Sequence, residues 1–252
     1  MNHASYTISI PIHVVKLLKE VVACAAPLKY VGNGPTGGVL LKLRRIGTAY
    51  YWVVAATNSF VLVERSCYAG ESEGDVHRHF KTLEGLTLSE AFSDISDGQV
   101  IPQSLIKAVK KPDKKALTSN NNAVLHLSTK DPLQLTTLDG VFRAKDKYEG
   151  AAFPKYEGAI NGAWDPVRDA IVIKPALLSL VSKALGLPPE GSIGFTSHGK
   201  GRGIGIQKGA DYGCSPYSPF DDLHLSQSGY RALIMPVAIP YDEGSYQDRV
   251  LP

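Results

Sequence analysis

The chain has 252 residues, of which 44% are hydrophobic and 20% are charged. This balance supports a large core and excludes global disorder, and no apolar run reaches the roughly 20 residues that a membrane helix needs. The first residues lack the basic and apolar segments of a secretion signal, and the three cysteines are widely spaced. We therefore expect a soluble, cytoplasmic protein with reduced thiols. The net charge of +3 is too small to identify a polyanionic partner.

Three amphipathic segments predict α-helices. Over residues 12–26, apolar side chains recur every three or four positions and Pro11 stands just before the first helical turn. A second helix is expected after Pro102, with Pro112 ending it. A third is expected over 175–185, where the following glycine and prolines stop it.

Each predicted helix follows a short β-like run that ends in isoleucine, and strand-like segments follow it. The predicted strands are 6–10, 38–43, 50–55, 60–65, 98–101, 123–128, 133–137, 141–145, 169–173, 192–197, 203–208 and 230–238. This order indicates one strand–helix–strands unit used three times, starting near residues 5, 97 and 168. The alternative is chance similarity between amphipathic helices. Either way we expect an α+β fold.

Polar segments divide the chain. Residues 69–97 are acidic and polar and read as a linker, and 158–165 separates the second unit from the third. We therefore predict one domain over 1–162 and a second, partial domain over 163–252. Residues 208–228 are expected to form a long loop inside that second domain.

No motif predicts a catalytic site, a cofactor or a metal. The glycine-rich run 199–205 joins two strand-like segments, so a hairpin is favoured over a phosphate-binding loop. His77 and His79 lack companions at metal-ligand spacing, and His198 and His224 have no recognisable nucleophile or carboxylate partner. Asp221 and its neighbour Asp222 are explained by turn chemistry. An enzyme on an unfamiliar scaffold is the weakest alternative.

Lysines gather on two of the predicted helices. They are Lys16 and Lys19 on the first, and Lys107, Lys110 and Lys111 on the second. Solvent-facing lysines contact phosphates as point charges and carry no base specificity. A solvated helix face is the ordinary explanation for one helix alone. Because the pattern repeats, it favours a surface that binds a polyanion without reading sequence.

Three stretches resemble the bacterial DNA sliding clamp. Residues 53–62, Val-Val-Ala-Ala-Thr-Asn-Ser-Phe-Val-Leu, are similar to the clamp strand that ends in Ala-Thr-Asp-Gly-His-Arg-Leu. Residues 153–156, Phe-Pro-Lys-Tyr, are similar to its Phe-Pro-Asp-Tyr, and 233–237, Leu-Ile-Met-Pro-Val, to its Met-Pro-Met-Arg-Leu terminus. All three follow the family's order, and residues 100–102 match its strand-to-helix entry. The resemblance covers 5–162 as one clamp domain and 165–240 as half of the last.

The resemblance implies half-domain repeats with helices on one face of antiparallel sheets. The helices would line the inner wall of a ring around duplex DNA. The resemblance also implies a processivity factor without catalysis, which docks short linear peptides of DNA polymerase and clamp-loader-type proteins in an apolar pocket. The pocket residues carried over are Thr57, Leu62, Pro102, Ile106, Met235 and Pro236. For Leu62 and Ile106, a simple core position is an equally good expectation.

The sequence also departs from the family. Asn58, Ser59, Phe60 and Val61 replace the family's Asp-Gly-His-Arg, and the chain continues past Pro236. A divergent, shortened clamp of phage or mobile-element origin would fit. Three units per chain would close a ring only as a tetramer, whereas a hidden fourth unit within 69–97 would allow a trimer. The alternative is a clamp-derived interaction or regulatory module that does not close a ring.

Overall fold

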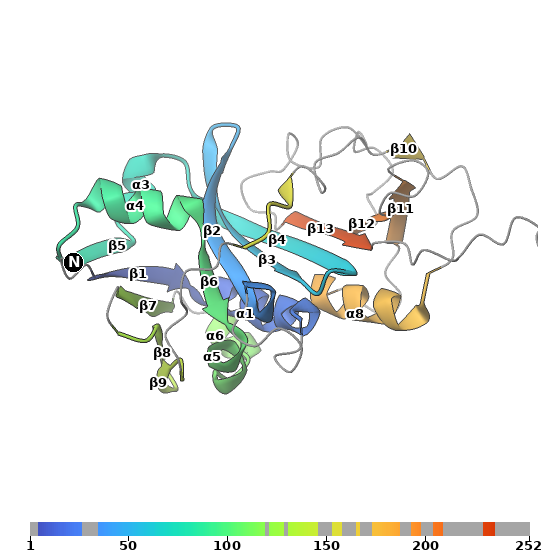
Figure 1. Cartoon of the computed structure of the whole chain (residues 1–252). Helices are drawn as coiled ribbons and strands as arrows, with labels where there is room; N and C mark the ends of the chain where they lie inside the picture. The colour runs from blue at the N-terminus through green and yellow to red at the C-terminus, as the bar shows by residue number, and fades with distance from the viewer. Residues whose placement is uncertain are drawn as a thin grey trace, which may run out of the picture.

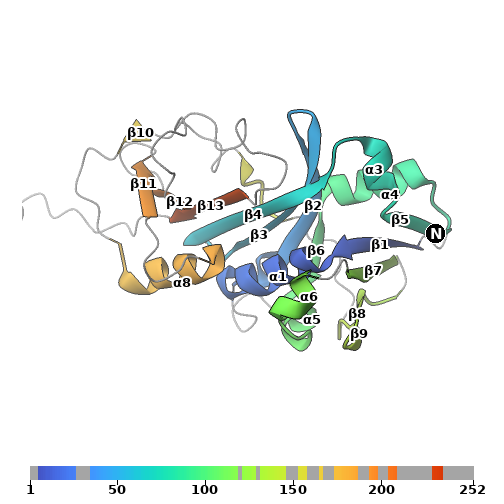
Figure 2. The same cartoon turned by 180° about the vertical axis from the view of Figure 1, so that it is seen from behind.

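The structure is a computed structural model of the whole chain. It describes residues 5–26, 35–118, 121–128, 131–145, 153–157, 165–166, 173–186, 193–197, 204–208 and 229–234. Two antiparallel sheets make up the fold, with helices packed against them (Figures 1 and 2). None of the helices within these ranges is long and apolar enough to cross a membrane.

Two complete strand–helix–strands units follow one another along the chain. The first consists of β1 (Ser5–Pro11), α1 (Ile12–Val21), β2 (Gly38–Ile46), β3 (Ala49–Thr57) and β4 (Val61–Gly70). The second consists of β6 (Gln99–Pro102), α5 (Gln103–Ala108), α6 (Lys114–Thr118), β7 (Asn122–Ser128), β8 (Gln134–Thr137) and β9 (Gly140–Arg143). The predicted order of elements is confirmed in both units. The second helix is shorter than predicted, because it ends at Ala108.

The third unit shows its helix and three following strands. These are α8 (Pro175–Leu185), β11 (Ile193–Ser197), β12 (Ile204–Lys208) and β13 (Gly229–Ile234), with a two-residue strand β10 (Asp165–Pro166) before them. The limits of α8 agree with the prediction, and β11 and β12 pair as the predicted hairpin. Apart from Ile173, the predicted strand 169–173 lies outside the described residues, as do 158–164 and 209–228.

Residues 69–97 are folded, which corrects the prediction of a linker. The segment forms α3 (Glu73–His77), β5 (Phe80–Glu84) and α4 (Leu88–Asp97). Both helices begin with a capping box, Ser72 with Asp75 and Thr87 with Glu90, in which each side chain accepts the other residue's backbone N–H. Because one strand between two helices is not another strand–helix–strands unit, the hidden fourth unit is ruled out here.

The first two units exchange their first strands. One sheet has the order β5-β1-β7-β8-β9, so β1 joins the strands of the second unit. The other has the order β10-β11-β12-β13-β4-β3-β2-β6, so β6 joins the strands of the first unit. Ile8 stands opposite Leu125, and Leu40 stands opposite Val100. The exchange makes the two units one structural body, because neither sheet is complete without the other unit.

The third unit continues the larger sheet. β13 pairs antiparallel with β4, from Gly229 opposite Ser66 to Ile234 opposite Val61. α8 packs on β4 and β13 and contacts α1. Strand pairing and helix contact thus join the third unit to the first.

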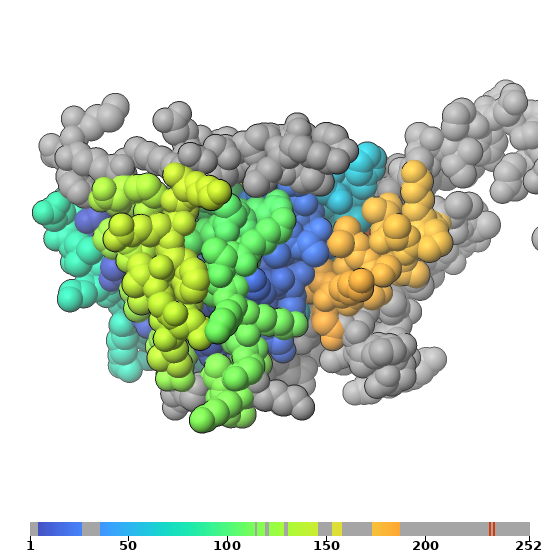
Figure 3. Space-filling view, turned by 90° about the horizontal axis from the view of Figure 1, so that it is seen from below, coloured from blue at the N-terminus to red at the C-terminus, as the bar shows by residue number. Residues whose placement is uncertain are grey.

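The helices α1, α5, α6 and α8 lie on one face of the molecule (Figures 1 and 2). Figure 3 shows their segments side by side on this face, with β8 and β9 beside α5 and α6. We call this the helix face. α1 forms because its apolar stripe buries Val14, Leu18 and Val21 completely or almost so against the sheet that carries Trp52. The opposite stripe of α1 carries the charged residues.

Candidate functional site

The lysines predicted to bind DNA differ in what they contact. Lys16 is half-buried on α1, and its ammonium lies 3.9 Å from the Glu20 carboxylate, one turn further on. Lys107 is exposed on α5 and donates a hydrogen bond to the side chain of Gln103. Neither contact neutralises the surface strongly, because Gln103 carries no charge and an ion pair in contact with water is weak. Both side chains remain available to a polyanion.

Lys19 has a structural role that the sequence did not reveal. Its ammonium donates to the backbone carbonyls of Ile106 at 3.1 Å, Lys107 at 3.3 Å and Val109 at 2.6 Å. These carbonyls lie at the end of α5, where a helix leaves its last acceptors without partners. Burial lowers the pKa of Lys19. The expectation that Lys19 faces DNA therefore needs correction, because its ammonium closes the end of α5.

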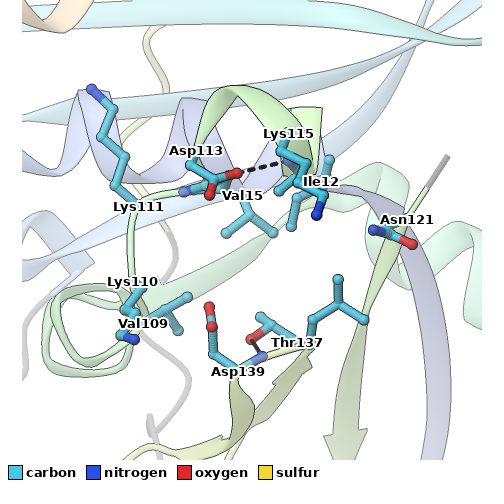
Figure 4. Close-up of a pocket in the computed structure, with 13 residues that line it drawn as sticks. Ile12, Val15, Val109, Lys110, Lys111, Asp113, Lys115, Asn121, Thr137 and Asp139 are labelled. Carbon is cyan, nitrogen blue, oxygen red and sulfur yellow. Dashed lines mark hydrogen bonds between the residues drawn. The ribbon is translucent and has the colours of Figure 1, made fainter. Parts of the chain in front are cut away.

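Lys110 and Lys111 lie in the loop after α5 rather than on the helix that was predicted for them. Both are exposed, and the Lys111 ammonium is 3.7 Å from the Glu20 carboxylate on α1. They line a cavity of about 380 Å³ together with Lys115 from α6 (Figure 4). The helix face thus brings exposed lysines of the second unit beside α1 of the first.

Glu20 on α1 is an acidic residue beside these lysines, and a buried arginine already balances most of its charge. Its carboxylate accepts a hydrogen bond from the Arg65 guanidinium, which is 3% exposed. The same guanidinium nitrogen donates to the Ala184 carbonyl of α8 at 3.3 Å. Since Glu20 is paired with a buried arginine, it offsets little of the positive charge that the surrounding lysines present to solvent.

The residues expected to form the peptide pocket are only partly brought together. Thr57 and Leu62 stand opposite each other at the β3–β4 turn. Pro102 is buried in β6, three positions away from β4 in the sheet, which is about 14 Å at the usual strand spacing. Ile106 is 1% exposed and belongs to the main core, so the core expectation is the correct one for it. Met235 and Pro236 lie outside the described residues.

The β3–β4 turn presents an aromatic side chain. The Asn58 side chain accepts the backbone N–H groups of Phe60 and Val61, at 3.1 and 2.9 Å, and Ser59 adopts a left-handed φ of 74°. This turn leaves Phe60 57% exposed. Ile234, the last described residue of β13, stands opposite Val61 beside the turn.

Residues 153–157 cover the larger sheet, on the face opposite the helices. The sequence did not assign them to a site. Tyr156 packs with Leu40, Ala55 and Leu62, and Phe153 packs against this cluster. The Tyr156 hydroxyl donates to Glu64 at 2.7 Å, and burial followed by the Glu64 charge raises the pKa of the phenol. The sequence did contain a signal for this segment, because residues 153–156 are one of the stretches that resemble the clamp.

The described residues show no metal cluster and no activated thiol. No group of three or more His, Cys, Asp or Glu among them is placed to hold a metal ion. Cys24 and Cys67 are free, and burial raises the pKa of both thiols to about 12. A thiol that stays protonated near neutral pH is a poor nucleophile.

Taken together, the paired units and one-sided helices define the half-domain fold of the bacterial sliding clamps. Three solved structures show the similarity. They are a DnaN sliding clamp (DNA polymerase III subunit beta) from Pseudomonas aeruginosa bound to griselimycin, the DNA polymerase III beta subunit from Thermotoga maritima, and a DnaN sliding clamp from Bartonella birtlesii bound to griselimycin.

Their TM-scores are 0.55, 0.55 and 0.54, at 11%, 12% and 11% sequence identity. The matches cover 92%, 92% and 94% of this chain and 65%, 65% and 66% of the clamps. At this identity the similarity establishes the fold and leaves function to be argued from the site. No family model and no curated protein sequence matches the chain.

Proposed function

We propose that this protein is a clamp-like processivity factor, which holds duplex DNA against its helix face without catalysis and without reading sequence. The observation that carries the proposal is the gathering of exposed lysines on the face where α1, α5, α6 and α8 lie together. The clamp fold of the chain supports it.

The proposed DNA contacts are Lys16, Lys107, Lys110 and Lys111. Their ammonium groups are point charges at the ends of flexible stems, so they hold phosphates loosely and allow the duplex to slide. Lys19 is left out, because its ammonium is bound to three backbone carbonyls. Lys115 joins the set, because it is exposed beside Lys110 and Lys111.

The proposed peptide-docking surface is the β3–β4 turn, with Thr57 and the exposed Phe60. Leu62 is only 6% exposed and packs with Tyr156, so it supports the turn from within. Met235 and Pro236 remain part of the proposal, because Ile234 directly before them pairs beside this turn. Pro102 and Ile106 are left to the core. The partners would be DNA polymerase and clamp-loader-type proteins in the cytoplasm, each contributing apolar anchor residues from a short linear peptide.

A homo-oligomeric ring is the assembly that this function needs. The pairing of β4 with β13 joins the last strands of two units, and β9, the last strand of the second unit, stands at the edge of its sheet. That open edge supports addition of a strand from another copy. Light scattering over a range of concentrations tests this. A monomer throughout would contradict the ring and favour an interaction module that does not encircle DNA.

Salt-dependent binding to duplex DNA tests the helix face. The variant carries serine in place of Lys16, Lys107, Lys110 and Lys111. The matched control carries Lys81→Ser and Lys155→Ser, which are exposed on β5 and in the segment 153–157, outside the four helices. We expect the variant to bind more weakly at low salt, with the slope of log K against log salt reduced by about 0.9 for each lost phosphate contact. The control should keep the original slope. Equal slopes for variant and control would contradict the proposed surface.

A further inference from the structure

A cavity of about 380 Å³ opens on the helix face where three segments meet. The first turn of α1, the loop from α5 into α6 and the β8–β9 turn surround it (Figure 4). Its apolar lining consists of Ile12, Val15, Val109, Pro112, Ala116 and Leu138. The volume lies in the range of small-ligand pockets, about 300–1,000 Å³. A DNA duplex, with its bases stacked inside, could rest on the rim but not enter.

The lining favours an aliphatic group over a nucleobase. None of the described residues that line the cavity is aromatic. Proteins hold unpaired bases chiefly by stacking them on aromatic rings, which this lining does not offer. Leu138 is 72% exposed at the rim, and Val141 on the same hairpin is 56% exposed. An aliphatic side chain that entered the cavity would bury apolar surface now in contact with water.

The charges on the rim fit a ligand that carries carboxylates. Lys110, Lys111 and Lys115 are exposed on the side of the α5–α6 loop. The Asp113 carboxylate is already bound, since it accepts the backbone N–H of Ala116 at 2.7 Å. Asp139 lies on the opposite side, where it can accept a backbone N–H from a ligand (Figure 4).

This combination distinguishes a peptide from a nucleic acid. A peptide supplies backbone N–H donors for Asp139 and acidic side chains for the lysines, whereas a phosphodiester offers Asp139 no donor. We infer that the cavity docks a short acidic peptide, with an aliphatic side chain in the cavity and carboxylates on Lys110, Lys111 and Lys115. This site is separate from the β3–β4 turn and stands without the proposed DNA binding.

Selection of random peptides on the full chain tests the inference. We expect the selected peptides to combine Leu, Ile or Met with flanking Asp or Glu. They should bind the Leu138→Asp and Lys115→Glu variants about tenfold more weakly, the loss typical of an anchor contact. Both positions are exposed, so the variants should retain the circular dichroism of the original chain. Leu83→Asp and Lys81→Glu, exposed on β5, are matched controls that should bind like the original chain.

The same variants are titrated with single-stranded oligothymidylate and with duplex DNA. Selected peptides that lack acidic residues, or that bind all variants equally, would overturn the inference. Oligothymidylate binding that depends on Leu138 would also overturn it, because the site would then take a nucleotide. If the chain binds no duplex, the proposed function fails while peptide binding remains measurable. If it binds both, peptide and duplex should compete, because they share Lys110 and Lys111.

Discussion

Two buried ion pairs lie on opposite faces of β4, at neighbouring positions. Glu64 points to the outer face, where the Arg44 guanidinium donates to both of its oxygens at 2.8 and 3.1 Å. Arg65 points to the helix face, where it binds Glu20 and the Ala184 carbonyl. Successive side chains of a strand alternate between faces, so two adjacent residues serve two different interfaces.

The two pairs hold different parts of the chain. On the outer face, Glu64 also accepts the Tyr156 hydroxyl and so fixes residues 153–157 to the sheet. On the helix face, Arg65 links α1 of the first unit to the end of α8 in the third. A buried ion pair adds little net stability, but removal of one partner is costly because the other charge stays buried. Each pair therefore acts mainly by fixing which segments meet.

The largest effect should follow from Glu64→Ala. It leaves the Arg44 guanidinium without its bidentate partner and the Tyr156 hydroxyl without its acceptor, so we expect the free energy of unfolding to fall by about 4 kcal/mol. Urea denaturation measures the change, with the exposed Glu71→Ala as the control. A loss below about 1 kcal/mol would contradict the importance of the outer pair.

Arg65→Met should have a somewhat smaller effect. It frees Glu20, but Lys16 and Lys111 stay within 3.9 and 3.7 Å of that carboxylate, so we expect a loss of about 3 kcal/mol. Hydrogen exchange sharpens the comparison between the two faces. Amides of α8 should exchange faster in Arg65→Met and remain protected in Glu64→Ala. Equal protection of α8 in the two variants would contradict a separate role for the helix-face pair.

Tyr156→Phe removes only one hydrogen bond to a charged group and keeps the ring in place. The expected loss is about 2 kcal/mol in urea denaturation. Because the pKa of the phenol is raised by its burial, the hydroxyl stays a donor in alkaline solution, and the loss should be the same at pH 7 and pH 9. A loss confined to one of these pH values would indicate a different partner for the hydroxyl.

Glu157→Gln should have the smallest effect, and one that depends on pH. Burial opposes the charged form of Glu157, but the hydrogen bond from Lys42, hydrogen bonds from backbone N–H groups and the Lys42 charge together outweigh it. The pKa of the carboxyl therefore lies below its usual value. A carboxyl whose pKa is lower in the folded than in the unfolded state stabilises the fold at pH values above its unfolded-state pKa. This contribution disappears as the pH falls through the folded-state pKa. We expect the variant to lose less than about 1 kcal/mol at pH 7 and a smaller amount at pH 3, by urea denaturation. A larger loss of stability at pH 3 than at pH 7 would contradict a lowered pKa for Glu157.

Local patterns predicted much of the fold. The limits of α8 followed from an apolar stripe bounded by Pro175 and Gly186, and the strands of the first two units followed from runs of β-branched and apolar residues. The elements of 69–97 were missed because they are short and polar, although the two capping boxes were present in the sequence. The exchange of β1 and β6 could not be predicted, because strand pairing depends on residues far apart in the chain.

The candidate site was less predictable, because it depends on tertiary contacts. A lysine that binds a helix end, such as Lys19, looks in the sequence like one that faces solvent. Pro102 and Ile106 were assigned by resemblance, and only the strand order separates Pro102 from Leu62. The role of residues 153–157 likewise appears only when Tyr156 is placed over Glu64.

The pairing of β4 with β13 also has a consequence during synthesis. β4 leaves the ribosome long before β13. The edge of β4 that pairs with β13 therefore stays without its partner strand while most of the chain is made. Closing so long a loop slows folding, and an unpaired strand edge invites pairing with other chains. Until β13 has been made, this edge of β4 can therefore pair with a strand of another chain.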